Sequence, residues 1–195
     1  MQATAFIIGA DEHRRQALFD LCADIGFRAI VNFSDLSLAE RQVQQTPICF
    51  FLVALSGIAH NTGGITRAIR TSKNRQIRLA PIVGFTENAD PQLVRAVLTF
   101  GFDDIIVPPF TANSVFPRLS SHLNRRISFY ETDHYFGPNR HVGLNKQQDQ
   151  DQEKALEYRK FLITRNIESG IRILRDEFYT GIPTNVTKGN FGIAV

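Results

Sequence analysis

One unbroken apolar segment limits the fold of this chain most strongly. Residues 48–55 read ICFFLVAL, with no charged or strongly polar side chain among them. A strand with one solvent-exposed face alternates apolar and polar residues, whereas a strand covered on both faces is apolar throughout. The segment is also far shorter than the ~20 residues that a membrane-spanning helix needs. It therefore predicts a central strand of a parallel sheet.

Other strand-like and helix-like segments alternate along the first two thirds of the chain. Strands are expected at residues 3–10, 27–33, 48–55, 80–86 and 104–107, and helices at 12–25, 34–45, 65–72, 93–101 and 115–124. This alternation predicts an α/β fold, a doubly wound five-stranded parallel sheet with right-handed crossovers. Ligands of such sheets bind at the carboxyl ends of the strands, so the residues that follow each strand are the candidates for function.

The residues at these strand ends resemble those of response regulator receiver domains, the CheY-like family of two-component signalling. Residues 6–11 (FIIGAD), 47–53 (PICFFLV), 82–86 (IVGFT) and 100–110 (FGFDDIIVPPF) are similar to the first, third, fourth and fifth receiver strands with their turns. The resemblance spans nearly all of residues 3–124 and implies a CheY/flavodoxin-like fold. In that family two acidic residues bind Mg²⁺, an aspartate accepts a phosphoryl group, a Ser or Thr senses it, and a lysine precedes a proline.

This sequence departs from the family pattern where the phosphoryl chemistry would occur. Val53 stands at the position of the phosphoacceptor, Ala10 replaces one acidic residue, and Pro108, followed by Pro109, replaces the lysine. Asp11 and Thr86 keep the expected residue types. The resemblance thus implies a degenerate pocket made of Ala10, Asp11, Val53, Thr86, Pro108 and Pro109.

Phosphoryl transfer needs a nucleophile, a Mg²⁺ site and a positive group for the phosphoryl oxygens. A valine cannot supply the first, and a single carboxylate makes Asp11 a weak candidate for the second. We therefore expect a pseudo-receiver without a phosphoacceptor, catalytic residues, bound metal or cofactor. Apolar replacement of the carboxylates also predicts that the pocket is packed as additional core.

A non-catalytic signalling module follows from this interpretation. It would act by contact with another signalling protein, namely a histidine kinase, a phosphotransferase or a response regulator, through a surface within residues 92–123. One alternative is an atypical receiver phosphorylated at Asp11, Thr86 or His13. Another is a transcriptional regulator that binds DNA through basic residues, which include Arg14, Arg15, Arg67, Arg70, Lys73, Arg75 and Arg78.

Residues 125–195 form a separate C-terminal extension in this interpretation. Residues 133–140 (DHYFGPNR) resemble a tail found after some alphaproteobacterial receiver domains, and the aromatic segment 129–136 is expected to pack on the domain or on a partner. A long helix is expected over about 149–179, with Gly170 interrupting it. Its apolar stripe would form a homodimer or dock on the domain through Leu156, Ile163, Ile167, Ile171, Leu174 and Phe178.

Composition adds few constraints. The formal net charge of +3 is too small to indicate nucleic-acid binding without clustering. Cys22 and Cys49 lie in apolar stretches without metal-ligand spacing, which is typical of buried thiols in a reducing compartment. We therefore expect a cytoplasmic protein with no membrane partner.

Overall fold

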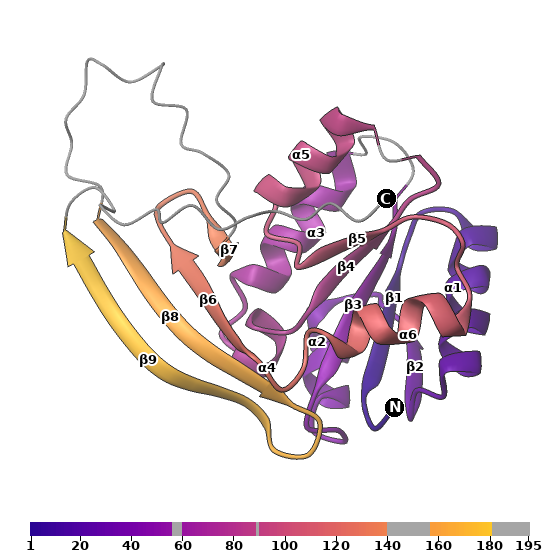
Figure 1. Ribbon diagram of the computed structural model, residues 1–195, viewed down its shortest axis with the longest axis horizontal. Helices are drawn as coiled ribbons and strands as arrows, with labels where there is room; N and C mark the ends of the chain where they lie inside the picture. Colours follow the sequence, from indigo (N-terminus) through magenta and orange to yellow (C-terminus); the bar gives the residue numbers. More distant parts are fainter. Residues whose placement is uncertain (56–59, 89, 140–156, 181–195) are drawn as a thin grey trace.

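The computed structural model describes residues 1–55, 60–88, 90–139 and 157–180, and it contains two sheets (Figure 1). The first is parallel and five-stranded, in the order β2-β1-β3-β4-β5. Its strands are β1 (Thr4–Ile8), β2 (Ala29–Asn32), β3 (Cys49–Ala54), β4 (Ile82–Phe85) and β5 (Asp104–Ile106). This order is that of the flavodoxin-like doubly wound folds, so the predicted fold class is confirmed.

Helices cover both faces of the parallel sheet. The helices are α1 (Glu12–Ile25), α2 (Leu36–Gln42), α3 (His60–Arg70), α4 (Arg75–Arg78), α5 (Pro91–Thr99) and α6 (Ala112–Ser120). Helices α1 and α6 bury apolar side chains in one core cluster, and α2, α3, α4 and α5 bury theirs in a second cluster on the opposite face. The short helix α4 was not expected from the sequence.

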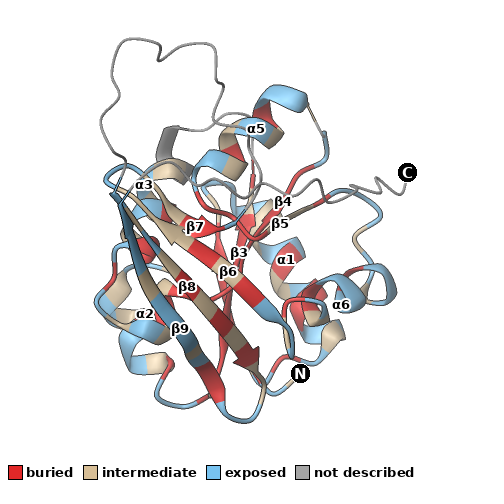
Figure 2. Ribbon diagram, turned by 60° about the vertical axis from the view of Figure 1, so that its left-hand side comes forward, coloured by how far each residue is buried: buried red, intermediate tan, exposed pale blue. Residues whose placement is uncertain are grey.

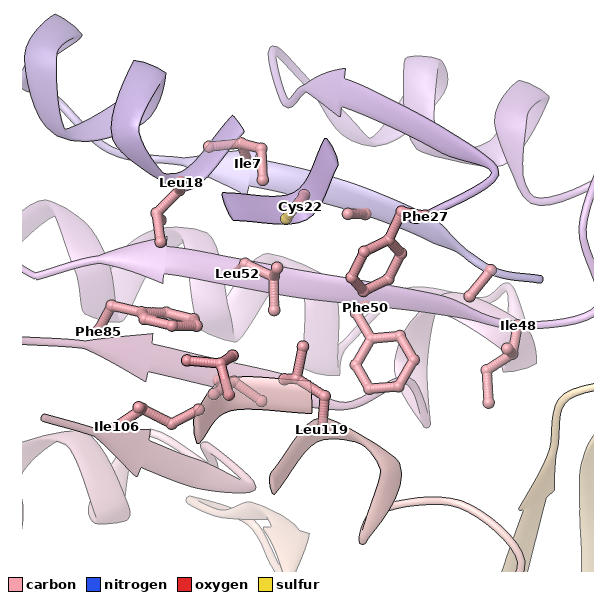
Figure 3. Packing of buried hydrophobic residues seen from close by; sticks show 14 of the residues in the cluster. Ile7, Leu18, Cys22, Phe27, Ile48, Phe50, Leu52, Phe85, Ile106 and Leu119 are labelled. Atoms are coloured by element: carbon pink, nitrogen blue, oxygen red, sulfur yellow. The ribbon is translucent and has the colours of Figure 1, made fainter. Parts of the chain in front are cut away.

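Strand β3 lies at the centre and contributes to both clusters. Phe50 and Leu52 pack with α1 and α6 (Figure 3), whereas Phe51 and Val53 pack on the other face. Every β3 residue from Cys49 to Val53 is buried. The two-sided burial predicted from the apolar run is therefore confirmed.

The C-terminal extension is a second, antiparallel sheet. Its strands β6 (Arg126–Glu131), β7 (Phe136–Pro138), β8 (Glu157–Asn166) and β9 (Gly170–Thr180) lie in the order β7-β6-β8-β9. The predicted helix over about 149–179 is wrong for residues 157–179, and residues 149–156 lie outside the described residues. The sheet stands beside the β5 edge of the parallel sheet (Figure 1).

The turn between β8 and β9 explains why a hairpin forms instead of a helix. The Asn166 side chain accepts hydrogen bonds from the backbone N–H groups of Glu168 and Ser169, which closes the turn. Gly170 has a φ of +76°, a left-handed conformation that favours glycine. A Cβ at this position would also lie 2.7 Å from the Pro47 carbonyl oxygen. Gly170 is thus a turn residue and not a helix interruption.

The inner face of the antiparallel sheet shares its core with the parallel sheet. Ile127, Phe129, Phe161, Ile163 and Ile171 belong to the same buried cluster as α1 and α6. The aromatic side chains of β6 and β7 therefore pack on the domain, which is one of the two outcomes expected for segment 129–136. The hydrophobic core continues across residue 124.

A buried ionic cluster joins the two sheets. Asp103, just before β5, accepts hydrogen bonds from Arg70 of α3 at 2.7 Å and from Arg165 of β8 at 2.8 Å. Both guanidinium groups also donate to backbone carbonyls, Arg70 to Ala80 and Gly101 and Arg165 to Leu79. The Phe129 ring lies 5.3 Å and 5.4 Å from the two guanidinium carbons.

Charge pairing in this cluster outweighs the penalty of burial. Burial by itself would raise the pKa of Asp103, but Arg165 and Arg70 hold the pKa of that carboxyl well below its usual range. A depressed native pKa means that Asp103 stabilises the fold fully above its unfolded pKa of about 3.9. This contribution is lost as the pH falls through the lower native pKa.

We expect Asp103→Asn to destabilise the protein by about 3–5 kcal/mol, because it leaves two buried guanidinium groups without a counter-charge. Urea denaturation at neutral pH measures the change. Asp176→Asn is the matched control, since it breaks the exposed Arg159–Asp176 pair and should change the stability by less than about 1 kcal/mol. Equal losses in the two variants would contradict a structural role for the buried cluster.

Candidate functional site

The candidate site is the carboxyl edge of the parallel sheet, where β1, β3, β4 and β5 end together. Val53 lies in register between Ile8 of β1 and Gly84 of β4, and Phe85 lies beside Ile106 of β5. The fold therefore brings the loops that follow these strands to a common edge, as the sequence predicted.

At β3 the structure places hydrocarbon where the resemblance implies a phosphoacceptor. The Val53 side chain is 3% exposed and packs in the second core cluster with Ile8 and Leu55. The last residue of the strand, Ala54, lies beside β1, since a Cβ on Gly9 would approach the Ala54 Cβ to 3.0 Å. Neither Val53 nor Ala54 carries an oxygen, so the end of β3 offers no nucleophilic side chain.

At β1 the retained carboxylate serves the helix that follows. Asp11 is the N-cap of α1, and its Oδ1 accepts a hydrogen bond of 2.8 Å from the Arg14 backbone N–H. Ala10 before it is exposed and Glu12 after it pairs with Arg15. Capping of this kind satisfies one of the free N–H groups of the first helical turn. Within the part of the chain that the structure describes, no three His, Cys, Asp or Glu residues gather closely enough to hold a metal ion.

At β4 the predicted sensor hydroxyl is buried and engaged. Thr86 follows the strand, its Oγ1 donates to the Asn88 carbonyl at 2.9 Å, and the same oxygen accepts from the Asn88 N–H at 3.3 Å. This local pairing holds the turn into the loop before α5. The Thr86 hydroxyl thus closes its own turn.

At β5 two prolines occupy the expected position of the lysine. The peptide bond between Pro108 and Pro109 is cis, and both side chains are exposed. The Ser114 hydroxyl donates to the Pro109 carbonyl at 2.6 Å, and Ser114 forms a capping box with Thr111 at the start of α6. No cation from β5 reaches the edge of the sheet, because proline has neither charge nor N–H.

Two arginines of α1 reach the edge instead, and sequence reasoning missed their role. Arg14 Nη1 donates to the Leu55 carbonyl after β3 at 3.0 Å, and Arg14 also lies 3.6 Å from Glu87 after β4. Arg15 Nη1 donates to the Gly9 carbonyl after β1 at 2.6 Å. Arginine in the first turn of a helix is unfavourable for the helix dipole, and that mismatch was the available signal.

The chemistry of the edge follows from these contacts. Its charged groups include two guanidinium groups that donate to backbone carbonyls, two carboxylates that pair with them, and the capping carboxylate of Asp11. A guanidinium between the loops that follow β1, β3 and β4 supplies a fixed positive charge, which opposes the binding of a divalent cation there. These contacts hold the loops of the edge together.

The other predicted residues separate into buried and exposed groups. Among the basic residues, Arg70 is 2% exposed within the ionic cluster, and Arg78 pairs with Glu131 and lies over the Phe136 ring. These residues do not form a single surface patch with Arg14 and Arg15. The stripe predicted for a dimer helix is wrong as a helix, and Leu156 lies outside the described residues. Its other members are Ile163 and Ile171 in the core, Ile167 packed against the core, and the exposed Leu174 and Phe178.

The sheet order β2-β1-β3-β4-β5 defines the class of fold, which is the flavodoxin-like doubly wound fold that CheY-like receiver domains share. No protein-family model matches the chain, and no curated protein matches it. No helix in the described residues is long and apolar enough to cross a membrane.

Solved structures with the same fold include three receiver-type proteins. A CheY-like protein (tadZ) of Pseudomonas aeruginosa is 17% identical, with a TM-score of 0.49, over 64% of this chain and 98% of that chain. The chemotaxis response regulator CheY4 of Vibrio cholerae is 16% identical, with a TM-score of 0.47, over 62% and 98%. An N-terminal receiver domain of a response regulator from Bacteroides fragilis is 22% identical, with a TM-score of 0.46, over 62% and 96%. At these identities the likeness concerns the fold.

We expect Arg14→Met to destabilise the protein by about 1 kcal/mol, since a partly exposed charged donor to the Leu55 carbonyl is lost. A loss of this size lowers the Tm of a chain of this length by about 2–4 °C in a circular dichroism melt. Arg28→Met, at an exposed arginine beyond the other end of α1, is the control and should leave the Tm unchanged. The same Tm for both variants would contradict a structural role for Arg14.

Proposed function

We propose that this protein is a non-catalytic signalling module, a pseudo-receiver that acts through protein–protein contact without aspartyl phosphorylation. The observation that carries the proposal is the end of β3, where Val53 and Ala54 stand in place of an acceptor carboxylate. Phosphoryl transfer to a receiver needs an attacking oxygen, and a hydrocarbon side chain has none.

The surroundings of β3 support the same proposal. Arg14 and Arg15 place fixed positive charge at the edge where Mg²⁺ would be needed, and Asp11 is engaged as a helix cap. Pro108 removes the cation that would face the phosphoryl oxygens. Three separate requirements of the reaction are therefore unmet, and restoring any one of them would leave the other two.

The proposed partner is another signalling protein, such as a histidine kinase, a phosphotransferase or a response regulator. The region around α5, β5 and α6 exposes large apolar side chains, with Phe116 45% and Val107 39% exposed. Exposed apolar side chains grouped on one region of a protein are typical of contact sites. We propose this region, within residues 92–123, as the partner surface.

Treatment with acetyl phosphate and Mg²⁺ tests the absence of phosphorylation. We expect a single unshifted band in phosphate-affinity electrophoresis, and unchanged backbone amide chemical shifts with beryllofluoride and Mg²⁺. Asp11→Asn is the informative variant. A shifted band in the wild type that Asp11→Asn abolishes would identify an atypical receiver and refute the pseudo-receiver.

Affinity capture with the full chain tests the partner surface. We expect Phe116→Glu to reduce recovery of the partner by about tenfold or more, because a charge enters an apolar contact. Arg28→Glu, at an exposed residue outside both residues 92–123 and β9, is the control and should leave recovery of that partner unchanged. Equal recovery with the wild type and Phe116→Glu would place the partner surface elsewhere.

A further inference from the structure

Strand β9 is a long and open edge of the antiparallel sheet. It runs over 11 residues, Gly170–Thr180, whereas strands average about 5–6 residues. Strand β8 pairs with one side of it, and no other described strand pairs with the other side. Figure 2 shows most of β9 as exposed, in contrast to the alternating burial of β8. Such an edge presents unpaired N–H and C=O groups to a further strand.

Two large apolar side chains lie exposed on this edge strand. Leu174 is 41% exposed and Phe178 is 63% exposed, the highest value among the large apolar side chains of the described residues. Covering both would remove apolar surface from water, at about 25 cal/mol per Å². An additional strand along β9 would satisfy the backbone edge and cover these side chains at the same time.

The order of residues along β9 is complementary to its own reverse. Residues 173–179 read ILRDEFY, so two apolar residues precede Arg175, Asp176 and Glu177, and two aromatic residues follow. If two copies of β9 run antiparallel about a twofold axis at Asp176, Arg175 faces Glu177 of the second copy on both sides of the axis. Leu174 is the extra residue of a bulge in β9, since Leu162 of β8 pairs with Arg175 and Ile163 pairs with Ile173. Counted past this bulge, Ile173 faces Phe178 and Arg172 faces Tyr179. Opposite charges and apolar pairs in these positions stabilise antiparallel strands.

A twofold axis restricts which registers two antiparallel copies of β9 can adopt. A twofold axis perpendicular to a sheet keeps each side chain on its own face, so the axis must pass through a residue and not between two residues. Shifting the axis to Arg175 would place two arginines opposite each other and, counted past the bulge at Leu174, Ile173 opposite Asp176. Like charges directly opposite each other destabilise a pair of strands, so the axis at Asp176 is the favoured one.

The residue on the axis already has a counter-charge. Asp176 accepts two hydrogen bonds of 2.6 Å from the Arg159 side chain of β8 in its own chain. Two Asp176 side chains brought together would therefore arrive with their charges balanced by two arginines. The like-charge contact at the centre of the register is offset within each copy.

We propose that β9 pairs antiparallel with β9 of a second copy of this chain, with Asp176 on the twofold axis. The four strands of each copy then join in one continuous sheet with β9 at its centre. Charged edge residues suppress indiscriminate strand pairing, whereas the mixed charges of β9 favour one register with itself. The degenerate pocket plays no part in this pairing, so the failure of either proposal leaves the other standing.

A charge exchange tests the proposal with the full chain in sedimentation equilibrium. We expect a dimer for the wild type and at least about tenfold weaker association for Arg175→Glu and for Glu177→Arg, since each places like charges opposite each other twice. The double variant Arg175→Glu with Glu177→Arg restores both opposite pairs and should restore the dimer. Arg172→Glu is the control, because Arg172 faces the uncharged Tyr179 in this register, and it should associate as the wild type does.

Three outcomes would overturn the proposal. They are a monomeric wild type at all concentrations, a dimer that neither single variant weakens, and a double variant that stays as weak as the single ones. The first outcome would also be expected if another segment or another protein occupied the edge of β9. Circular dichroism spectra of the variants establish that a lost dimer does not reflect unfolding.

A single cysteine on the axis tests the register directly. Residues directly opposite in an antiparallel pair have Cα atoms about 4.5–5.5 Å apart, which suits a disulfide. Asp176→Cys should therefore form a covalent dimer on oxidation, whereas the two cysteines of Arg172→Cys would lie about 23 Å apart and should not. The native Cys22 and Cys49 are buried and should not interfere. Cross-linking of Arg172→Cys in preference to Asp176→Cys would refute the register.

Discussion

The carboxylate of Asp103, held between Arg70 and Arg165, is the constraint on which the rest of the structure depends. It connects α3, the start of β5 and β8, three elements that are far apart in the sequence. Two buried guanidinium groups would be strongly destabilising without this counter-charge and the backbone carbonyls that they also contact. Because Arg165 belongs to β8, the parallel sheet cannot satisfy the cluster without the antiparallel sheet.

Guanidinium groups bonded to backbone carbonyls hold the parallel sheet at its other end as well. At the carboxyl edge, Arg14 and Arg15 fix the loops after β3 and β1 through the Leu55 and Gly9 carbonyls. The loops therefore keep their positions through charge-assisted hydrogen bonds from α1. The end of β3 carries no carboxylate, and the loop that follows it is fixed by Arg14.

Much of the α/β half follows from its sequence, because its pattern of burial is local. The apolar run 48–55 can only be covered on both faces, and the substitutions at Val53 and Pro108 are visible without coordinates. The role of Arg14 was not predictable, since it depends on a carbonyl more than 40 positions away. The hairpin was missed because Ile163, Ile167, Ile171, Leu174 and Phe178 fit a heptad spacing as well as two strands. The buried charge of Arg165 also concealed the alternation of Phe161 and Ile163.

The two contact surfaces inferred for this molecule lie on different elements, and that separation matters for how it could work. Helix α6 packs against α1 on one face of the parallel sheet, whereas β9 is the outermost strand of the antiparallel sheet (Figure 1). Self-association through β9 therefore leaves the side chains of Phe116 and Val107 uncovered in each copy. A twofold assembly would present two copies of the partner surface at once, and two linked sites bind a partner of matching symmetry more tightly than one site does. In the proposed pseudo-receiver, assembly of this kind would supply a way to regulate contact without chemistry at the sheet edge.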